Sequence, residues 1–237
     1  TIVDDLVVDD NGAVLGVKVR ENYRFGREKS GKVAYYRATK GVLLAAGGFS
    51  QNVQMRMEHD PRLNEKFGST NHPGATGEAL QAAQMIGANT IQMDWIQLGP
   101  WTSPDENGFG LAPLFVEPAV GYGLMIDPAT GKRFIQETGN RKVRSDAIVA
   151  TGHPAVLAVS VDNVGHVPAE ALKTGLEKGV VKTFDSAEAL ADFHKIPKDA
   201  FMASLKTWNE AVKAKKDPAF NAKIFDDTKV NQGKFYS

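Results

Sequence analysis

The sequence predicts a mixed fold, in which a partial α/β domain is followed by an α+β domain. A short apolar run at residues 40–46 has the length of a buried strand, and it ends on Gly47 and Gly48. A second glycine turn, at Gly77, leads into apolar residues at helical spacing. Strands that end on glycines, and helices that begin after them, bring backbone amides close to a ligand in many α/β proteins. We therefore expect residues 40–88 to face a ligand.

The first 37 residues predict a three-stranded β-meander. Asn11 and Gly12 lie between two apolar runs, and Asn-Gly in that position is a strong signal for a tight hairpin. The expected strands are residues 6–8, 14–19 and 33–37. Turns of this kind usually serve structure, so we expect the meander to have a structural role and no catalytic one.

Two helices and one further strand are expected in the rest of this region. Apolar residues recur at helical spacing over 52–58 and 77–87, and a proline or a glycine ends each pattern. Residues 90–97 have the apolar content of a strand that leads into a new region.

The character of the chain changes near Asp94, so we place a domain boundary there, between residues 1–93 and 94–237. Glycines and prolines from Leu98 to Pro113 predict a long irregular loop, which is uncommon without a function. The elements expected after this loop are a hairpin over residues 122–136, a helix over 141–150, a buried strand over 155–161, and helices over 168–178, 186–194 and 197–215.

The composition of the chain argues against several classes of function. Its 28 basic and 28 acidic side chains balance, so the totals give no basic face for nucleic acid. The absence of cysteine excludes disulfides, cysteine-bound zinc, covalent haem attachment and iron–sulfur clusters within these 237 residues. No apolar run reaches the length of a membrane-spanning helix, and the five histidines have no metal-ligand spacing.

Several motifs occur in an order that is typical of one known family. They are Ala45-Ala46-Gly47-Gly48-Phe49, Ala75-Thr76-Gly77-Glu78-Ala79, Asp94-Trp95-Ile96-Gln97, Gly131-Lys132-Arg133-Phe134 and, finally, Arg141. In this order they resemble the flavoprotein subunit of the fumarate reductase/succinate dehydrogenase superfamily. Within it, flavocytochrome c fumarate reductases and related 2-enoate reductases, for urocanate or methacrylate, are the most similar. The resemblance implies FAD, a partial glutathione-reductase-like FAD-binding domain over residues 1–93, and a capping (clamp) domain over 94–237.

The resemblance also predicts that the chain is an internal piece of a longer protein. The family has a GxGxxG fingerprint upstream and a His-His-x-x-Gly-Gly segment downstream, and this sequence contains neither. The piece alone is therefore expected to bind flavin poorly and to be inactive. The resemblance implies an electron-donor domain or protein as partner, allows haem or FMN on further domains, and implies a periplasmic location by analogy with flavocytochrome c.

The implied chemistry depends on Arg141. The resemblance makes it the proton donor to the α-carbon of an activated alkene, while flavin N5 supplies a hydride to the β-carbon. A guanidinium is a poor acid, so a carboxylate must return the proton, and the resemblance assigns that relay to Glu117. The residues alone also fit a solvated arginine at a helix start and a surface carboxylate.

The cofactor-binding residues that the resemblance implies come from the two glycine segments. They are Ala46, Gly47, Gly48, Thr76, Gly77 and Glu78. Glu78 stands where the family has aspartate, which puts its contact with the flavin in question. The residues alone also fit a simple strand-to-loop turn at the first segment and a favourable acidic helix start at the second.

Two departures from the fumarate-reducing relatives predict a different substrate. Val120 stands where those relatives have an arginine, and Gly99 stands where they have a histidine that binds a substrate carboxylate. A charge-assisted hydrogen bond contributes about 1.5–3 kcal/mol, so a dicarboxylate should bind less well. Gly99, Trp101 and Phe109 instead indicate a roomier or more aromatic pocket. We expect a small unsaturated carboxylate other than fumarate.

Two other functions stay open on the sequence. One is a different enzyme on the same scaffold, either a 3-ketosteroid dehydrogenase-like protein or a succinate-oxidising flavoprotein. The other is a non-catalytic α+β module that binds a ligand or a partner.

Overall fold

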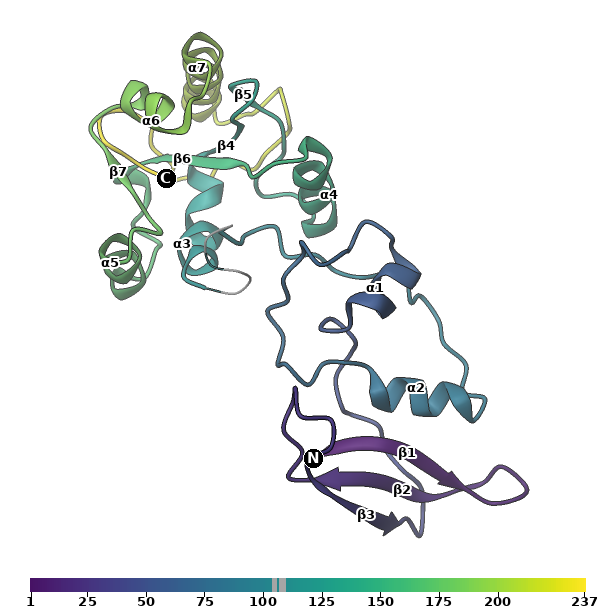
Figure 1. The fold of residues 1–237 in the computed structure, drawn as a ribbon. Coiled ribbons are helices and arrows are strands. Elements are labelled where there is room, and N and C mark those ends of the chain that lie inside the picture. The colour runs from purple at the N-terminus through teal and green to yellow at the C-terminus, as the bar shows by residue number, and fades with distance from the viewer. Residues whose placement is uncertain (104–105, 107–109) are drawn as a thin grey trace. The chain divides into compact units, whose positions relative to one another are not determined.

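The computed structural model of the protein describes residues 1–103, 106 and 110–237 (Figure 1). These residues form two compact units, Thr1–Ile96 and Gln97–Ser237. Both units combine helices with an antiparallel sheet, so the predicted mixed fold is confirmed. None of the described helices has the length and apolar character needed to cross a membrane.

The first unit begins with the predicted meander, in the strand order β1-β2-β3. Its strands are β1 (Ile2–Val8), β2 (Val14–Glu21) and β3 (Lys32–Arg37). The hairpin between the first two strands is held by Asp9, whose carboxylate accepts the backbone N–H groups of Asn11 at 2.9 Å and Ala13 at 2.8 Å. Gly12 has a φ of 82°, which is the backbone conformation that the Asn-Gly pair supplies at low cost.

Both helices predicted for this unit are present. Helix α1 (Val53–His59) is capped by Asn52, whose side-chain oxygen accepts the N–H of Met55 at 3.0 Å. Helix α2 (Glu78–Met85) packs against β1, where Ala82 and Ala83 form a small apolar cluster with Leu6.

Two predicted strands of the first unit are absent, and both predictions were wrong. Residues 40–46 and 90–97 are irregular, and several of their large apolar side chains are exposed: Leu43 is 90%, Ile91 83% and Trp95 75% accessible. An apolar run becomes a strand only where a neighbouring strand supplies hydrogen-bond partners. In the part of the chain that the structure describes, neither run is hydrogen-bonded into a sheet.

The second unit is built on a five-stranded antiparallel sheet of order β5-β4-β6-β8-β7. Its strands are β4 (Leu124–Asp127), β5 (Lys132–Arg133), β6 (Val156–Ser160), β7 (Thr183–Phe184) and β8 (Phe235–Tyr236). The predicted hairpin is confirmed as β4–β5, and the predicted buried strand is β6 at the centre of the sheet. All five residues of β6 are buried, which is why its first four residues are apolar without alternation.

The helices of this unit include all four that were predicted, with bounds that differ by a few residues. They are α4 (Arg141–Thr151), α5 (Ala169–Glu177), α6 (Ala187–His194) and α7 (Lys198–Ala214), with short 3₁₀ turns at Val120–Tyr122 (η2) and Val161–Asn163 (η3). Figure 1 shows α6 and α7 on one side of the sheet, with α3 and α5 on the other.

Helix α3 (Ala112–Ala119) was not predicted, because the loop expected after Leu98 was extended through Pro113. Pro113 instead lies in the first helical turn, where a missing N–H costs no hydrogen bond. Other residues used for the loop prediction lie outside the described residues, namely Pro104, Asp105, Asn107 and Gly108.

Side chains from the two central strands point alternately to two apolar clusters, as the period of a β-strand requires. Leu124 and Ile126 of β4 join the cluster formed with α6 and α7. Met125 of β4 and Leu157 and Val159 of β6 join the opposite cluster, which also contains Phe115 and Trp101.

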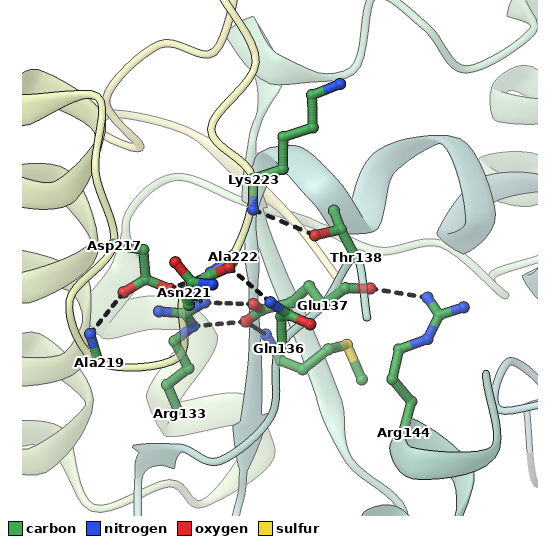
Figure 2. A network of polar contacts seen from close by, with 11 residues as sticks. Arg133, Gln136, Glu137, Thr138, Arg144, Asp217, Ala219, Asn221, Ala222 and Lys223 are labelled. Atoms are coloured by element: carbon green, nitrogen blue, oxygen red, sulfur yellow. Dashed lines mark hydrogen bonds and ion pairs between the residues drawn. The ribbon is translucent and has the colours of Figure 1, made fainter. Parts of the chain in front are cut away.

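A buried ion triad connects β5 to the loop that follows α7 (Figure 2). The Arg133 guanidinium donates to Glu137 at 2.8 and 2.6 Å, and its Nη2 lies 2.8 Å from Asp217 Oδ2. The rings of Trp208 and Phe220 lie against the same guanidinium. Burial opposes ionisation of Asp217, but hydrogen bonds from Arg133 and the Ala222 N–H hold the pKa of this carboxyl below its ordinary value.

We expect Arg133→Met to lower the free energy of unfolding by about 3–5 kcal/mol, because it leaves two buried carboxylates without their cation. Equilibrium unfolding in urea measures this change. The control is Lys132→Met, which removes an exposed cation from the same strand and should change stability by less than about 0.5 kcal/mol. Equal effects of the two variants would contradict the structural role of the triad.

Candidate functional site

A hollow of about 320 Å³ lies in the first unit, where the two predicted glycine segments meet. Its walls include Ala46 and Gly47 from the first segment and Gly77 and Glu78 from the second. These are four of the six residues expected to contact a cofactor, brought together from positions about 30 residues apart. The volume is within the usual range for a small-molecule site.

Both segments depend on glycine for their backbone conformation. Gly47 has a φ of 84° and Gly77 a φ of 85°, a region that other residues adopt at a cost. A Cβ added at Gly77 would lie 2.9 Å from Phe49 Cβ and from Met55 Sδ, so the turn is also closely packed. A Cβ added at Gly47 would meet no atom within 4 Å, so a ligand can approach this backbone closely.

The remaining predicted cofactor residues, Thr76 and Gly48, are placed differently. The Thr76 hydroxyl donates a hydrogen bond to the Glu78 carboxylate, which fixes that side chain at the start of α2. Gly48 is exposed and does not line the hollow.

Asn52 supports the second glycine segment from outside the hollow, and it was not predicted as a site residue. Its side-chain nitrogen donates to the Thr76 carbonyl at 3.0 Å, while its oxygen caps α1. The side chain therefore ties the start of one helix to the turn before the next. Its capping role was the available signal, since asparagine is among the preferred residues at this position.

The residues present fit the FAD that the sequence implies. The hollow exposes glycine backbone without side chains, and it lies at the N-terminal end of α2, where free N–H groups favour oxygen-rich ligands. The Gly47 backbone and the α2 N-terminus can hold part of such a cofactor. Among the described residues, no three or more histidine, aspartate or glutamate side chains are grouped to hold a metal ion.

The second unit brings together the two predicted catalytic residues. Helix α4 begins at Arg141 because Asn140 caps it, accepting the N–H of Lys142 at 2.9 Å. Glu117 lies near the end of α3, and its Oε1 is 3.6 Å from Arg141 Nη2. Both side chains are about half exposed, at 47% and 50%. This is an open ion pair, slightly longer than a hydrogen bond, in which a proton can pass after a small movement or through one water.

The three predicted substrate-pocket residues do not share one environment. Val120 and Trp101 are buried in the same apolar cluster, so position 120 presents no polar group. Gly99 is exposed, and a Cβ added there would meet no atom within 4 Å. Phe109, which was also expected at this pocket, lies outside the described residues.

A second arginine near the Arg141–Glu117 pair was missed. Arg144 lies one turn further along α4, is buried, and donates from Nη1 to the Glu137 carbonyl at 2.7 Å. Burial lowers the pKa of Arg144, the negative charge of Glu117 acts to raise it, and the positive charge of Arg141 acts to lower it. Its sequence spacing from Arg141 was a signal that the two share a helix face.

Comparison with known proteins finds a matching family and several relatives. Residues 1–237 match the family described as FAD binding domain. The acrylate reductase flavoprotein subunit of Shewanella woodyi is 39% identical over 223 residues, which cover 92% of this chain and 44% of that relative.

Two solved structures are similar in fold. The open conformation of a flavocytochrome c3 fumarate reductase matches with a TM-score of 0.60 and 25% identity, covering 99% of this chain and 39% of that one. A 3-ketosteroid Δ1-dehydrogenase from Sterolibacterium denitrificans matches with a TM-score of 0.73 and 24% identity, covering 99% of this chain and 46% of that one. The chain spans less than half the length of these proteins.

The two glycine turns should differ in their tolerance of a side chain. Gly47→Ala introduces only backbone strain, and we expect it to lower the free energy of unfolding by about 1–2 kcal/mol. Gly77→Ala adds a steric clash with Phe49 and Met55, which costs about 1–3 kcal/mol more. Urea unfolding of the two variants beside the parent chain measures the difference. Equal losses would show that the packing at Gly77 is not a constraint.

Proposed function

The chain belongs to the FAD binding domain family, and from this premise we propose that the full-length protein reduces the C=C bond of a small 2-enoate such as acrylate. The observation that carries the proposal is the pairing of Arg141 with Glu117, 3.6 Å apart in the second unit. The 39% identity to an acrylate reductase flavoprotein subunit supports the same reaction class.

In this proposal, the first unit is part of the FAD-binding domain and the second is the capping domain. FAD, when bound, supplies the hydride that is added to the β-carbon of the alkene. Ala46, Gly47, Gly77 and Glu78 would hold the cofactor through exposed backbone and the helix start.

Arg141 would add the proton to the α-carbon. In water a guanidinium keeps its proton at all ordinary pH values, so it can act as an acid only if the proton is replaced as it leaves. In this proposal Glu117 replaces it; the support is that the Glu117 carboxylate is the acidic group that pairs with Arg141 among the described residues. Both groups are half exposed, so protons from solvent can recharge the pair.

The substrate in this proposal carries a single carboxylate. A dicarboxylate needs cationic or hydrogen-bonding groups for both of its ends, and two positions that supply them in the resembling fumarate reductases are occupied here by Val120 and Gly99. Val120 is 3% exposed within an apolar cluster, so water cannot take the place of the missing arginine side chain there. Each missing group removes about 1.5–3 kcal/mol of binding.

The first test removes the acid from the full-length, FAD-loaded protein. Arg141→Gln should lower kcat for acrylate reduction, measured with a reduced viologen dye, by about 10²–10⁴-fold, because the general acid is lost. Lys142→Gln removes a neighbouring exposed cation from the same helix and should leave kcat within twofold of the parent. The flavin absorbance of both variants should be unchanged. If Arg141→Gln retains more than half of the parent kcat, Arg141 is not the proton donor.

The second test compares substrates. We expect kcat/KM for acrylate to exceed that for fumarate by at least about tenfold, because one lost charge-assisted contact of about 1.5 kcal/mol corresponds to that factor. Steady-state rates with both substrates, under the same reduced dye, measure the ratio. A ratio of one or less would refute the preference for a monocarboxylate.

A further inference from the structure

The hollow in the first unit has few charged side chains in its walls. Among the described residues that line it, His72 has the one side-chain nitrogen and Glu78 the one side-chain carboxylate. No arginine or lysine among those residues is present to balance a phosphate, and the Glu78 carboxylate would repel one. The hollow is therefore suited to a neutral part of FAD that offers oxygen acceptors and hydroxyl donors, such as its ribose or ribityl hydroxyls.

The His72 imidazole has its proton on a defined nitrogen. The Gly74 N–H donates to His72 Nδ1 at 2.9 Å. A nitrogen that accepts this bond is unprotonated, so the neutral imidazole carries its proton on Nε2. Nε2 has no hydrogen-bond partner in the part of the chain that the structure describes. His72 therefore presents a free N–H donor at the wall of the hollow.

The imidazole ring is also held in place by aromatic contacts. Phe25, which lines the same hollow, meets it edge-on with ring centroids 6.2 Å apart, and Phe25 is itself in edge contact with Tyr23 at 5.3 Å. A Cβ added at Gly74 would lie 2.7 Å from Phe25 Cζ and 3.1 Å from His72 Nδ1, so this packing requires glycine at position 74. The donor is thus oriented before a ligand binds, which lowers the entropic cost of binding.

We propose that His72 is a cofactor-binding residue whose Nε2–H donates a hydrogen bond to a neutral oxygen of FAD in the hollow. This inference rests on the proposed function, in which Gly47 and Glu78 hold the same cofactor. The Thr76 hydroxyl occupies one Glu78 oxygen, and the other has no partner among the described residues, so it can accept a hydroxyl of the ligand. The two side chains together offer a donor and an acceptor to one part of FAD.

Two substitutions separate the roles of the two ring nitrogens. His72→Asn places an oxygen near the position of Nδ1 and can still accept the Gly74 N–H, but it removes the Nε2 donor. His72→Gln places an amide nitrogen near the position of Nε2 and keeps a donor there. We expect the Kd of the full-length apoprotein for FAD, measured by flavin fluorescence, to rise about tenfold in His72→Asn and less than about threefold in His72→Gln.

The melting temperature separates binding from folding. Without FAD, His72→Asn should melt within about 2 °C of the parent, because the Gly74 N–H keeps its acceptor. Added FAD should raise the Tm of His72→Asn by less than it raises that of the parent, because the affinity is lower. The control is His153→Asn, which changes a histidine of the second unit that contacts Asp127 at 3.2 Å, and it should leave the Kd for FAD within twofold.

Two binding outcomes would overturn the inference. A Kd within twofold of the parent in His72→Asn would show that His72 only shapes the turn before Gly74. A Kd in His72→Gln as weak as that in His72→Asn would show that a donor at the Nε2 position makes no contact with FAD.

Turnover of acrylate separates this inference from the proposed function. If His72→Asn binds FAD more weakly while the FAD-loaded parent fails to reduce acrylate, the proposed reaction fails and the His72 contact stands. If the parent reduces acrylate and His72→Asn binds FAD as the parent does, the His72 contact fails and the proposed reaction stands.

Discussion

The second unit depends on the burial of Arg133 between Glu137 and Asp217. Two carboxylates and one guanidinium can be taken out of water together only if every charge is paired and hydrogen-bonded, and here the contacts are 2.6–2.8 Å. The triad fixes Glu137, and the backbone carbonyl of Glu137 in turn fixes Arg144 (Figure 2). Helix α4, which also carries Arg141, is thereby connected to the structural core of the unit.

Sequence reasoning succeeded where local signals decide the structure. The Asn11-Gly12 hairpin and the helix expected over residues 52–58 need only a few neighbouring residues. It failed at residues 40–46 and 90–97, because a strand needs a partner that the pattern of its own residues does not reveal. It also missed α3, because proline usually indicates a loop, whereas Pro113 is tolerated in a first helical turn.

Part of the candidate site was also predictable from the sequence. Ala46, Gly47 and Gly77 gather at one hollow, as two glycine segments that face one ligand should. Arg144 was not predictable as a buried residue, because its burial depends on Trp101 and on a carbonyl from another part of the fold. A charged side chain is predicted to be exposed from sequence alone, and only tertiary contacts show that it is buried.

The central claim is that the Arg141 guanidinium delivers a proton to the α-carbon of an enoate. The most direct measurement is a crystal structure of the full-length protein with FAD and a non-reacting saturated analogue, such as propionate, bound in place of the substrate. The account predicts that an Arg141 nitrogen lies about 3–3.5 Å from the α-carbon, which is the distance at which reacting groups are held before transfer. An Arg141 side chain directed into bulk solvent, away from both the flavin and the bound analogue, would contradict it.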